Sequence, residues 1–158
     1  MYALLDTDPF AQALLTSRIP ARMGYIGLDG TPRVIPIGYL YKDHLIQAFT
    51  VPMSRKVAAL RANPNVALTI DTETFPPHVL MVRGTAAVDV VDGVPDEYLE
   101  ASHKNVPDEQ FAEFEAQVRT LYDQMARILI TPTWVKVLDF QTRAPEAVVR
   151  IMREKGLS

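Results

Sequence analysis

The first clear pattern of apolar and polar positions predicts a β-hairpin. Residues 22–28 and 33–40 are rich in strand-forming side chains and flank the dipeptide Asp29-Gly30. Asp and Gly both tolerate the positive φ angles of a tight turn, so we expect the two segments to pair antiparallel. Pro36 lies within the second segment and has no N–H to donate to a ladder. The second strand is therefore expected at a sheet edge or at a bulge.

Five later segments also have the composition of strands: residues 44–49, 66–70, 79–91, 127–130 and 134–140. A turn at Tyr41-Lys42-Asp43 leads into the first of them, and Thr131-Pro132 is predicted to separate the last two. Successive strands joined by short turns favour an antiparallel arrangement over a parallel sheet with crossover helices. We therefore predict an α+β fold, built as an antiparallel barrel of six to seven strands with peripheral helices.

Helical spacing of apolar residues marks the peripheral elements. Asp8 and Pro9 are the residue types of an N-cap and a first helical position, and they begin a short helix that is expected to cover the core. Further helices are predicted from Ser54 to Asn63-Pro64, over residues 96–103 and 108–125, and from Pro145 to about Lys155. The wide apolar stripe of residues 108–125 is typical of core packing rather than of a cofactor-binding motif.

Composition and charge narrow the class of protein. The 158 residues, 48% hydrophobic and 22% charged, are typical of one soluble domain spanning residues 1–158. The absence of cysteine removes thiol chemistry and cysteine-ligated metals. A formal net charge of -3 argues against a nucleic-acid partner, which needs clustered Lys and Arg. No apolar stretch approaches the roughly 20 residues of a membrane span, and the N-terminus lacks the pattern of a signal peptide. We therefore expect a cytoplasmic protein without a membrane partner.

The strongest chemical indication is Ser54-Arg55-Lys56, where a strand gives way to a helix. Two cations in the first turn of a helix cost about 0.3 to 1 kcal/mol each against the helix dipole, so their presence calls for an anion. With Ser54 as N-cap, the free backbone N–H groups and the two cationic side chains would together bind a phosphate. The alternative is that Arg55 and Lys56 are solvated surface cations.

The order of these features resembles the pyridoxamine 5'-phosphate oxidase-like family. The similarity runs through residues 22–91, and residues 131–134 add a weaker match. It consists of the hairpin around Asp29-Gly30, an aromatic-Thr pair at a strand end, Ser54-Arg55-Lys56 and a downstream Asn-Pro. The resemblance implies a split β-barrel homodimer that holds FMN in grooves at the subunit interface.

By position, the resemblance also implies which residues contact the cofactor. Arg55 and Lys56 would hold the phosphate, Thr50 would lie beside the ribityl chain or the ring, and residues 33–38 would line the isoalloxazine. Trp134 would contact a cofactor edge from the partner subunit, or else anchor the core or the interface. The predicted cofactor-binding residues are Arg33, Val34, Ile35, Pro36, Ile37, Gly38, Phe49, Thr50, Ser54, Arg55, Lys56 and Trp134.

The function implied by the resemblance is that of an FMN-dependent oxidoreductase acting on a small organic substrate. Hydride chemistry would belong to the cofactor, so no catalytic side chain is assigned. Gly38 stands where the vitamin B6 oxidases carry a lysine, which argues against pyridoxamine phosphate as the substrate. Two alternatives on the same fold are a deazaflavin-dependent reductase and a non-catalytic flavin- or haem-binding protein. His44, His78 and His103 lack metal-ligand spacing, so no metal site is predicted, although His78 or His103 could serve haem as an axial ligand.

Overall fold

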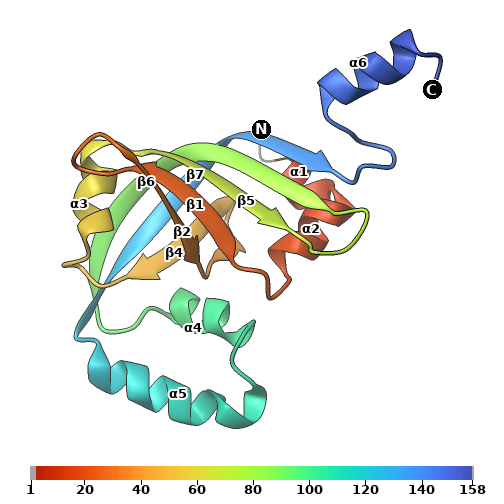
Figure 1. The fold of residues 1–158 in the computed structure, drawn as a ribbon. Helices are drawn as coiled ribbons and strands as arrows, with labels where there is room; N and C mark the ends of the chain where they lie inside the picture. The colour runs from red at the N-terminus through yellow and green to blue at the C-terminus, as the bar shows by residue number, and fades with distance from the viewer. Residues whose placement is uncertain (1–2, 158) are drawn as a thin grey trace.

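Seven strands form an antiparallel sheet within residues 3–157, which are the residues that the computed structural model describes. The strands are β1 (Ala21–Ile26), β2 (Pro32–Ile37), β3 (Leu40–Lys42), β4 (Leu45–Thr50), β5 (Asn65–Asp71), β6 (Val79–Asp92) and β7 (Gln124–Leu138). They are hydrogen-bonded in the order β2-β1-β5-β6-β7-β4-β3, and the sheet curves round on itself (Figure 1). The predicted α+β fold, an antiparallel split barrel, is confirmed.

Helices surround this sheet at its ends and below it (Figure 1). Those described are α1 (Ala3–Thr7), α2 (Pro9–Leu15), α3 (Arg55–Ala62), α4 (Asp96–His103), α5 (Asp108–Leu121) and α6 (Glu146–Glu154). The helix predicted to reach Met125 ends at Leu121, because Met125 lies in β7 and packs into the same apolar cluster as α5. Among residues 3–157, no helix has the length and apolar character needed to cross a membrane.

One long strand replaces the two that Thr131-Pro132 was predicted to separate. The register between β6 and β7 shifts between Arg83 and Gly84, so that Gly84 lies opposite Pro132 and Arg83 lies opposite Trp134. β4 pairs with β7 over Ala126 to Ile130, which leaves Pro132 beyond that ladder. The missing N–H of Pro132 therefore falls at a bulge, where the sheet does not need it.

A corner at Tyr39 divides the second predicted strand, residues 33–40, into β2 and β3. The Tyr39 side chain is buried, and its hydroxyl donates to the Leu14 carbonyl oxygen at 3.0 Å, which ties the corner to α2. Tyr41-Lys42, predicted as part of a turn, belongs to β3. The turn falls instead at Asp43-His44, where both φ angles are positive at 54° and 62°.

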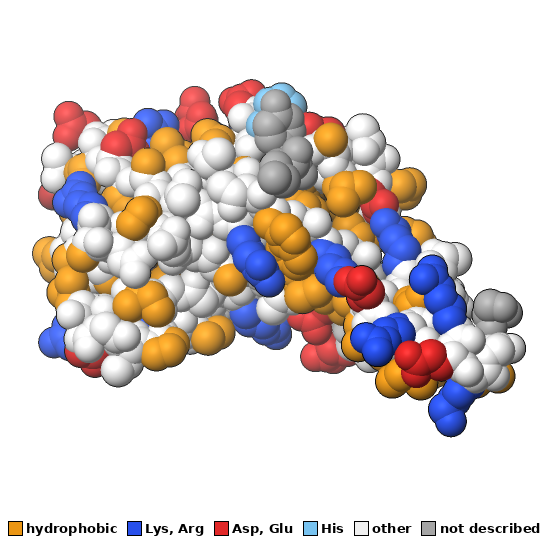
Figure 2. Space-filling view, turned by 90° about the horizontal axis from the view of Figure 1, so that it is seen from above, with side chains coloured by type: hydrophobic (Ala, Val, Ile, Leu, Met, Phe, Trp, Pro, Cys, Tyr) orange, Lys and Arg blue, Asp and Glu red, His pale blue; other side chains and the backbone are white. Residues whose placement is uncertain are grey.

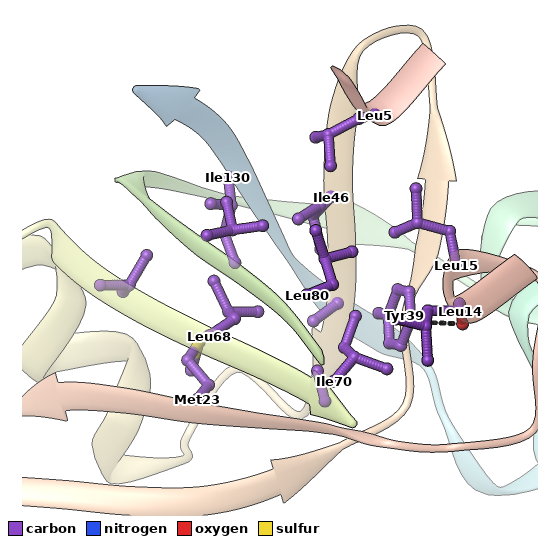
Figure 3. Close-up of a cluster of buried hydrophobic side chains, with 14 of the residues drawn as sticks. Leu5, Leu14, Leu15, Met23, Tyr39, Ile46, Leu68, Ile70, Leu80 and Ile130 are labelled. Atoms are coloured by element: carbon purple, nitrogen blue, oxygen red, sulfur yellow. Dashed lines mark hydrogen bonds between the residues drawn. The ribbon is translucent and has the colours of Figure 1, made fainter. Parts of the chain in front are cut away.

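The main core lies between the curved sheet and helices α1 and α2 (Figure 3). A large apolar side chain contributes about 1.5 to 3 kcal/mol when it is fully buried. Asp8 begins α2 as predicted, because its carboxylate accepts the N–H groups of Phe10 and Ala11. The largest side chains of this core include Leu5, Leu14, Leu15, Met23, Tyr39, Ile46, Leu68, Ile70, Leu80 and Ile130.

A second apolar cluster joins α4 and α5 to the barrel. The predicted apolar stripe of α5 packs into it, as expected for a core role, although Leu121 is exposed. The buried members are Val94, Leu99, Val118 and Met125, and the half-buried aromatic members are Phe49, Tyr98, Phe111, Phe114 and Tyr122.

Lys104 is a half-buried cation beside the main core. Its Nζ lies 3.6 Å from the centre of the Tyr39 ring and donates to the Leu15 carbonyl oxygen at 3.3 Å. Burial lowers the pKa of Lys104 to about 8. Below that pH both the folded and the unfolded chain carry the charge, and the folded protein bears the cost of holding it away from water.

Stability is therefore expected to rise with pH above about 8. Up to the ordinary lysine pKa of about 10.4, the unfolded chain keeps a proton that folded Lys104 has released. After allowance for solvent screening, we expect a gain of roughly 1 to 2 kcal/mol in the free energy of unfolding. Urea unfolding at several pH values should show this rise in the native protein and not in Lys104→Met. An equal rise in both proteins would contradict the prediction.

The chain that follows β7 is fixed to the end of the barrel by Asp139. The Thr142 hydroxyl and the backbone N–H groups of Arg143, Gln141 and Thr142 all donate to this buried carboxylate, and they hold its pKa well below the usual range. Arg143 in turn binds the Asp8 carboxylate at the start of α2, which lowers the pKa of Asp8. Beyond this clamp the chain leads to α6.

Candidate functional site

The β1–β2 hairpin and α3 enclose a cleft that brings together two of the predicted cofactor-binding residues. The cleft has a volume of about 380 Å³, and we call it the hairpin cleft. Arg33 reaches it from β2 and Arg55 from the first turn of α3. Its lining residues are Tyr25, Gly27, Leu28, Asp29, Arg33, Arg55 and Ala59.

Arg33 is held in place by Asp29. Its Nη2 donates to Asp29 Oδ2 at 2.9 Å, and the Thr31 hydroxyl and backbone N–H donate to the same carboxylate at 2.7 and 3.0 Å. These contacts lower the pKa of Asp29 and raise that of Arg33, so both groups remain charged. Gly27 leaves room for the guanidinium, because a Cβ atom at this position would lie 2.9 Å from Arg33 Cζ.

Arg55 has no such counter-charge. Within residues 3–157, neither Arg55 nor Lys56 makes an ion pair or a side-chain hydrogen bond. Ser54 is the N-cap, as predicted, but its side chain makes no capping hydrogen bond, and its carbonyl oxygen accepts the Val57 N–H at 3.0 Å. The cleft therefore combines an uncompensated cation with the electropositive end of an eight-residue helix, an arrangement that attracts anions.

The outer edge of β2 offers backbone groups beside the hairpin cleft. β2 is an edge strand, which confirms the prediction drawn from Pro36. The Gly27 N–H donates to the Thr31 carbonyl oxygen at 2.9 Å, and hydrogen-bonded pairs alternate along an antiparallel ladder. The backbone N–H and C=O groups of residues 32, 34 and 36 therefore point away from β1. Since Pro32 and Pro36 have no N–H, Val34 supplies the outward-facing N–H of this strand.

A second hollow lies on the outer face of the sheet, and we call it the outer groove. It consists of two adjoining hollows of about 530 and 280 Å³ that share Gly24, Val34, Ala67 and Arg83. Trp134 lines the smaller one, and the Arg83 guanidinium lies 4.2 Å from the centre of its ring, a cation–π contact. Every charged residue that lines the outer groove is an arginine: Arg22, Arg33 and Arg83.

Sequence reasoning missed Arg22 and Arg83. Each is one exposed position in a strand, and its neighbours depend on strand register, which the sequence pattern did not supply. For Arg83 the register also includes the shift between Arg83 and Gly84, which leaves Thr133 of β7 without an opposite residue. The available signal was the alternation of exposed and buried positions along residues 79–91. It indicates which side chains of this strand share a face of the sheet, but not which residues of the neighbouring strands lie opposite them.

Several predicted residues line neither the hairpin cleft nor the outer groove. Phe49 packs with Tyr98 in the second apolar cluster, at a ring-centre distance of 5.7 Å. Thr50 lies opposite Ala126 in the β4–β7 ladder, and Lys56 is half-buried at the start of α3.

The β2 stretch has two kinds of side chain. Ile35 and Ile37 pack against the main core, so only their backbone is left for other contacts. Pro36 and Gly38 are exposed.

The three histidines lie apart from both hollows. His44 Nδ1 lies 3.0 Å from Asp6, His78 packs edge-on against Phe10, and His103 stacks on Phe111. Within residues 3–157, no three or more His, Asp or Glu side chains are grouped so that they could hold a metal ion.

Fold and geometry together define a split-barrel protein with a basic cleft at the start of a helix. The chain belongs to the pyridoxamine 5'-phosphate oxidase family, whose model matches residues 7–135. No curated protein sequence matches the chain significantly.

Solved structures share the same fold. An F420 reductase is 22% identical, with a TM-score of 0.59 over 79% of this chain and 94% of that one. A conserved hypothetical protein from Mycobacterium tuberculosis is 17% identical, with a TM-score of 0.64 over 85% and 86% of the two chains. The heme storage protein HutZ from Vibrio cholerae is 15% identical, with a TM-score of 0.59 over 82% and 93%. Identities this low establish a common fold and nothing finer.

Proposed function

We propose that this protein is an FMN-dependent oxidoreductase that acts on a small organic substrate. The observation that carries the proposal is the meeting of Arg33 and Arg55 in the hairpin cleft, directly beside the free backbone edge of β2. A phosphate-bearing planar cofactor needs cations at one end and hydrogen-bonding groups along the other. The cleft and the edge offer both.

The donor set of the cleft fits a flavin phosphate. Arg55 and the first-turn N–H groups of α3 would bind the phosphate, with Ser54 and Lys56 at the same helix end. Arg33, already oriented by Asp29, would add a second guanidinium at the cleft wall. The Asp29 carboxylate also faces the cleft, and its ion pair with Arg33 reduces its repulsion of an anion.

The residues of this chain would bind the cofactor and stabilise charge on it. A bound flavin supplies the hydride-transfer chemistry itself. The Val34 N–H would donate to a polar atom at the ring edge and stabilise negative charge there, while the carbonyl oxygens of residues 32, 34 and 36 would accept from ring N–H groups. No side chain is needed as a nucleophile.

We further propose that residues 1–158 form one domain that works as a homodimer in the cytoplasm. Trp134 lines the outer groove and not the hairpin cleft, so its proposed contact is with a cofactor held by the partner subunit. A two-fold dimer would supply that contact twice.

A deazaflavin-dependent reductase is the second candidate function. An F420 reductase shares the fold over 79% of this chain, and a deazaflavin phosphate tail would use the same basic cleft. A haem protein has less support, because His78 and His103 pack against phenylalanine rings and line neither hollow.

The test is the visible absorption spectrum of the purified protein, followed by fluorescence titration with FMN and with F420. We expect micromolar or tighter binding of FMN and a weaker response to F420. Preferential binding of F420 would move the protein to the reductase class. A Soret band on addition of haemin, without flavin binding, would overturn the proposal.

A further inference from the structure

The outer groove lies over one row of residues that are opposite one another in neighbouring strands. Leu68 points into the main core (Figure 3), so its neighbour Ala67 faces outward into the groove. Gly24 lies opposite Ala67, and these two residues carry at most a methyl group, so the middle of the row is a low apolar floor. From β2 to β7 the row consists of Val34, Gly24, Ala67, Arg83 and Trp134.

Arg83 is held beside this floor without a counter-charge. Its guanidinium carbon lies 4.2 Å from the centre of the Trp134 ring. Within residues 3–157, the Arg83 side chain forms no ion pair and no hydrogen bond. A cation–π contact uses the face of a guanidinium, whereas the N–H donors lie in its plane. Trp134 therefore orients Arg83 and leaves its donors available to an anion.

The other charged residues of the groove add to its positive character. Arg22 lies two positions before Gly24 on β1, on the same face, and among residues 3–157 it has no ion-pair partner. Its Nη1 donates to the Pro20 carbonyl oxygen at 3.4 Å. Asp29 offsets the charge of Arg33, but no acidic side chain lines either hollow. The groove therefore attracts anions through guanidinium groups from the two strands that flank β5.

The donors of the groove suit a carboxylate better than a phosphate. Every described residue that lines it belongs to a strand, and α6 projects away from the barrel (Figures 1 and 2). The lining thus lacks the helix N-terminus that is typical of phosphate sites. The planar fork of an arginine matches the two oxygens of a carboxylate. Hollows of about 530 and 280 Å³ have the size of a site for a small molecule.

We infer that the outer groove binds a small organic acid, with the carboxylate on Arg83 and the apolar part over Gly24 and Ala67. The inference rests on the proposed function in one respect, because it names the class of the small organic substrate. Binding of the acid itself requires no cofactor.

The position of the acid is compatible with the proposed cofactor contact. Arg83 covers one face of the Trp134 ring, which leaves the other face and the ring edge for a cofactor held by the partner subunit. An acid bound to Arg83 would then lie beside that cofactor, where a substrate has to be.

Trp134 is the only tryptophan of the chain, so its fluorescence reports directly on the groove. The test is a titration of the full chain, without added FMN, with benzoate and with benzamide. The two molecules have nearly the same shape, and only benzoate carries a charge. We expect a saturable change of the Trp134 emission with benzoate and a dissociation constant at least tenfold higher for benzamide.

Variants separate the contribution of the charge from that of the floor. Arg83→Gln is expected to weaken benzoate binding at least tenfold and benzamide binding less than twofold. Arg153→Gln, which removes the same charge from an exposed position of α6, should leave both constants unchanged. Ala67→Ile fills the floor and should weaken both molecules. Calorimetric titration of the same variants gives the constants without relying on Trp134.

Several results would overturn the inference: equal affinity for benzoate and benzamide, equal losses in Arg83→Gln and Arg153→Gln, or no binding of benzoate. Inorganic phosphate that binds as tightly as benzoate would also do so, because it would show general attraction of anions only. The FMN titration is a separate measurement. A protein that binds FMN and not benzoate would refute this inference alone, whereas one that binds benzoate and not FMN would refute the proposed cofactor and retain the acid site.

Discussion

Replacing both Arg55 and Lys56 with alanine is expected to weaken FMN binding by at least two orders of magnitude. A charge-assisted hydrogen bond contributes about 1.5 to 3 kcal/mol, and a loss of about 1.4 kcal/mol corresponds to a tenfold change in affinity. Arg55 lines the hairpin cleft whereas Lys56 does not, so most of the loss should appear in Arg55→Ala alone. Flavin fluorescence titration of the two single variants and the double variant measures how much of the lost affinity comes from each residue.

A matched control is available on the same helix. Arg61 is an exposed cation in the last turn of α3, and its replacement by alanine changes the net charge by the same amount. We expect Arg61→Ala to bind FMN like the native protein. If Arg61→Ala and Arg55→Ala lose affinity equally, the effect is one of overall charge and the cleft is not the phosphate site. Unchanged affinity in the double variant would reject the assignment outright.

A side chain at Gly84 is expected to destabilise the fold by overpacking, even when it is only the methyl group of Gly84→Ala. A Cβ atom at Gly84 would lie 2.4 Å from the Thr131 carbonyl oxygen and 3.0 Å from Ile130 Cγ2. The first of these is backbone of the neighbouring strand and cannot move without disturbing the β6–β7 ladder at its bulge. Overpacking at a buried position costs about 1 to 3 kcal/mol, and Gly84→Val should exceed Gly84→Ala.

Gly38→Ala provides the comparison for this prediction. A Cβ atom at Gly38 would have nothing within 4 Å, and its φ is not positive. The added methyl group should therefore leave stability unchanged or raise it by up to about 1 kcal/mol by restricting the unfolded chain. Urea unfolding gives both values. A Gly84→Ala protein with the native midpoint would show that the two strands do not approach so closely.

The sequence pattern succeeded at two places where neighbouring residues determine the structure. The β1–β2 hairpin follows from the conformational freedom of Asp29-Gly30, and Gly30 does adopt a positive φ of 79°. The start of α2 follows from the carboxylate of Asp8, which accepts the two N–H groups that the helix leaves unpaired. In both places the residues that cause the structure are neighbours in sequence.

The same reasoning failed where a distant strand decides the outcome. Pro132 has the residue type of a strand breaker, but it lies within β7 at the point where the pairing with β6 shifts register. Met125 continues the apolar spacing of α5 while lying in a different element that packs into the same cluster. Local propensity predicts neither result. The place of Pro132 depends on a strand about 40 or more residues away, and that of Met125 depends on the shape of the apolar cluster.

The candidate site likewise has a part that was predicted and a part that was not. Arg33 and Arg55 were assigned to one cofactor site through family resemblance, Arg33 beside the ring and Arg55 at the phosphate, since a hairpin and a helix start carry no information about their separation. The outer groove was not predicted at all, because its lining comes from five strands and its shape depends on their register. Phe49 was predicted to bind the cofactor, but its side chain packs in the second apolar cluster. An aromatic residue next to a motif can equally well be a core residue.

The two prolines of β2 have a consequence for behaviour at high concentration. An exposed edge strand normally offers a row of N–H and C=O groups onto which another chain can add, and this is a common route to β-aggregation. Here a strand approaching β2 would meet Pro32 and Pro36 at two of the three outward positions and find one N–H, that of Val34. At the opposite edge, β3 has only three residues. Aggregation through sheet extension is thus opposed at both ends of the barrel sheet, and replacing Pro36 with a β-branched residue such as Val would remove part of that protection.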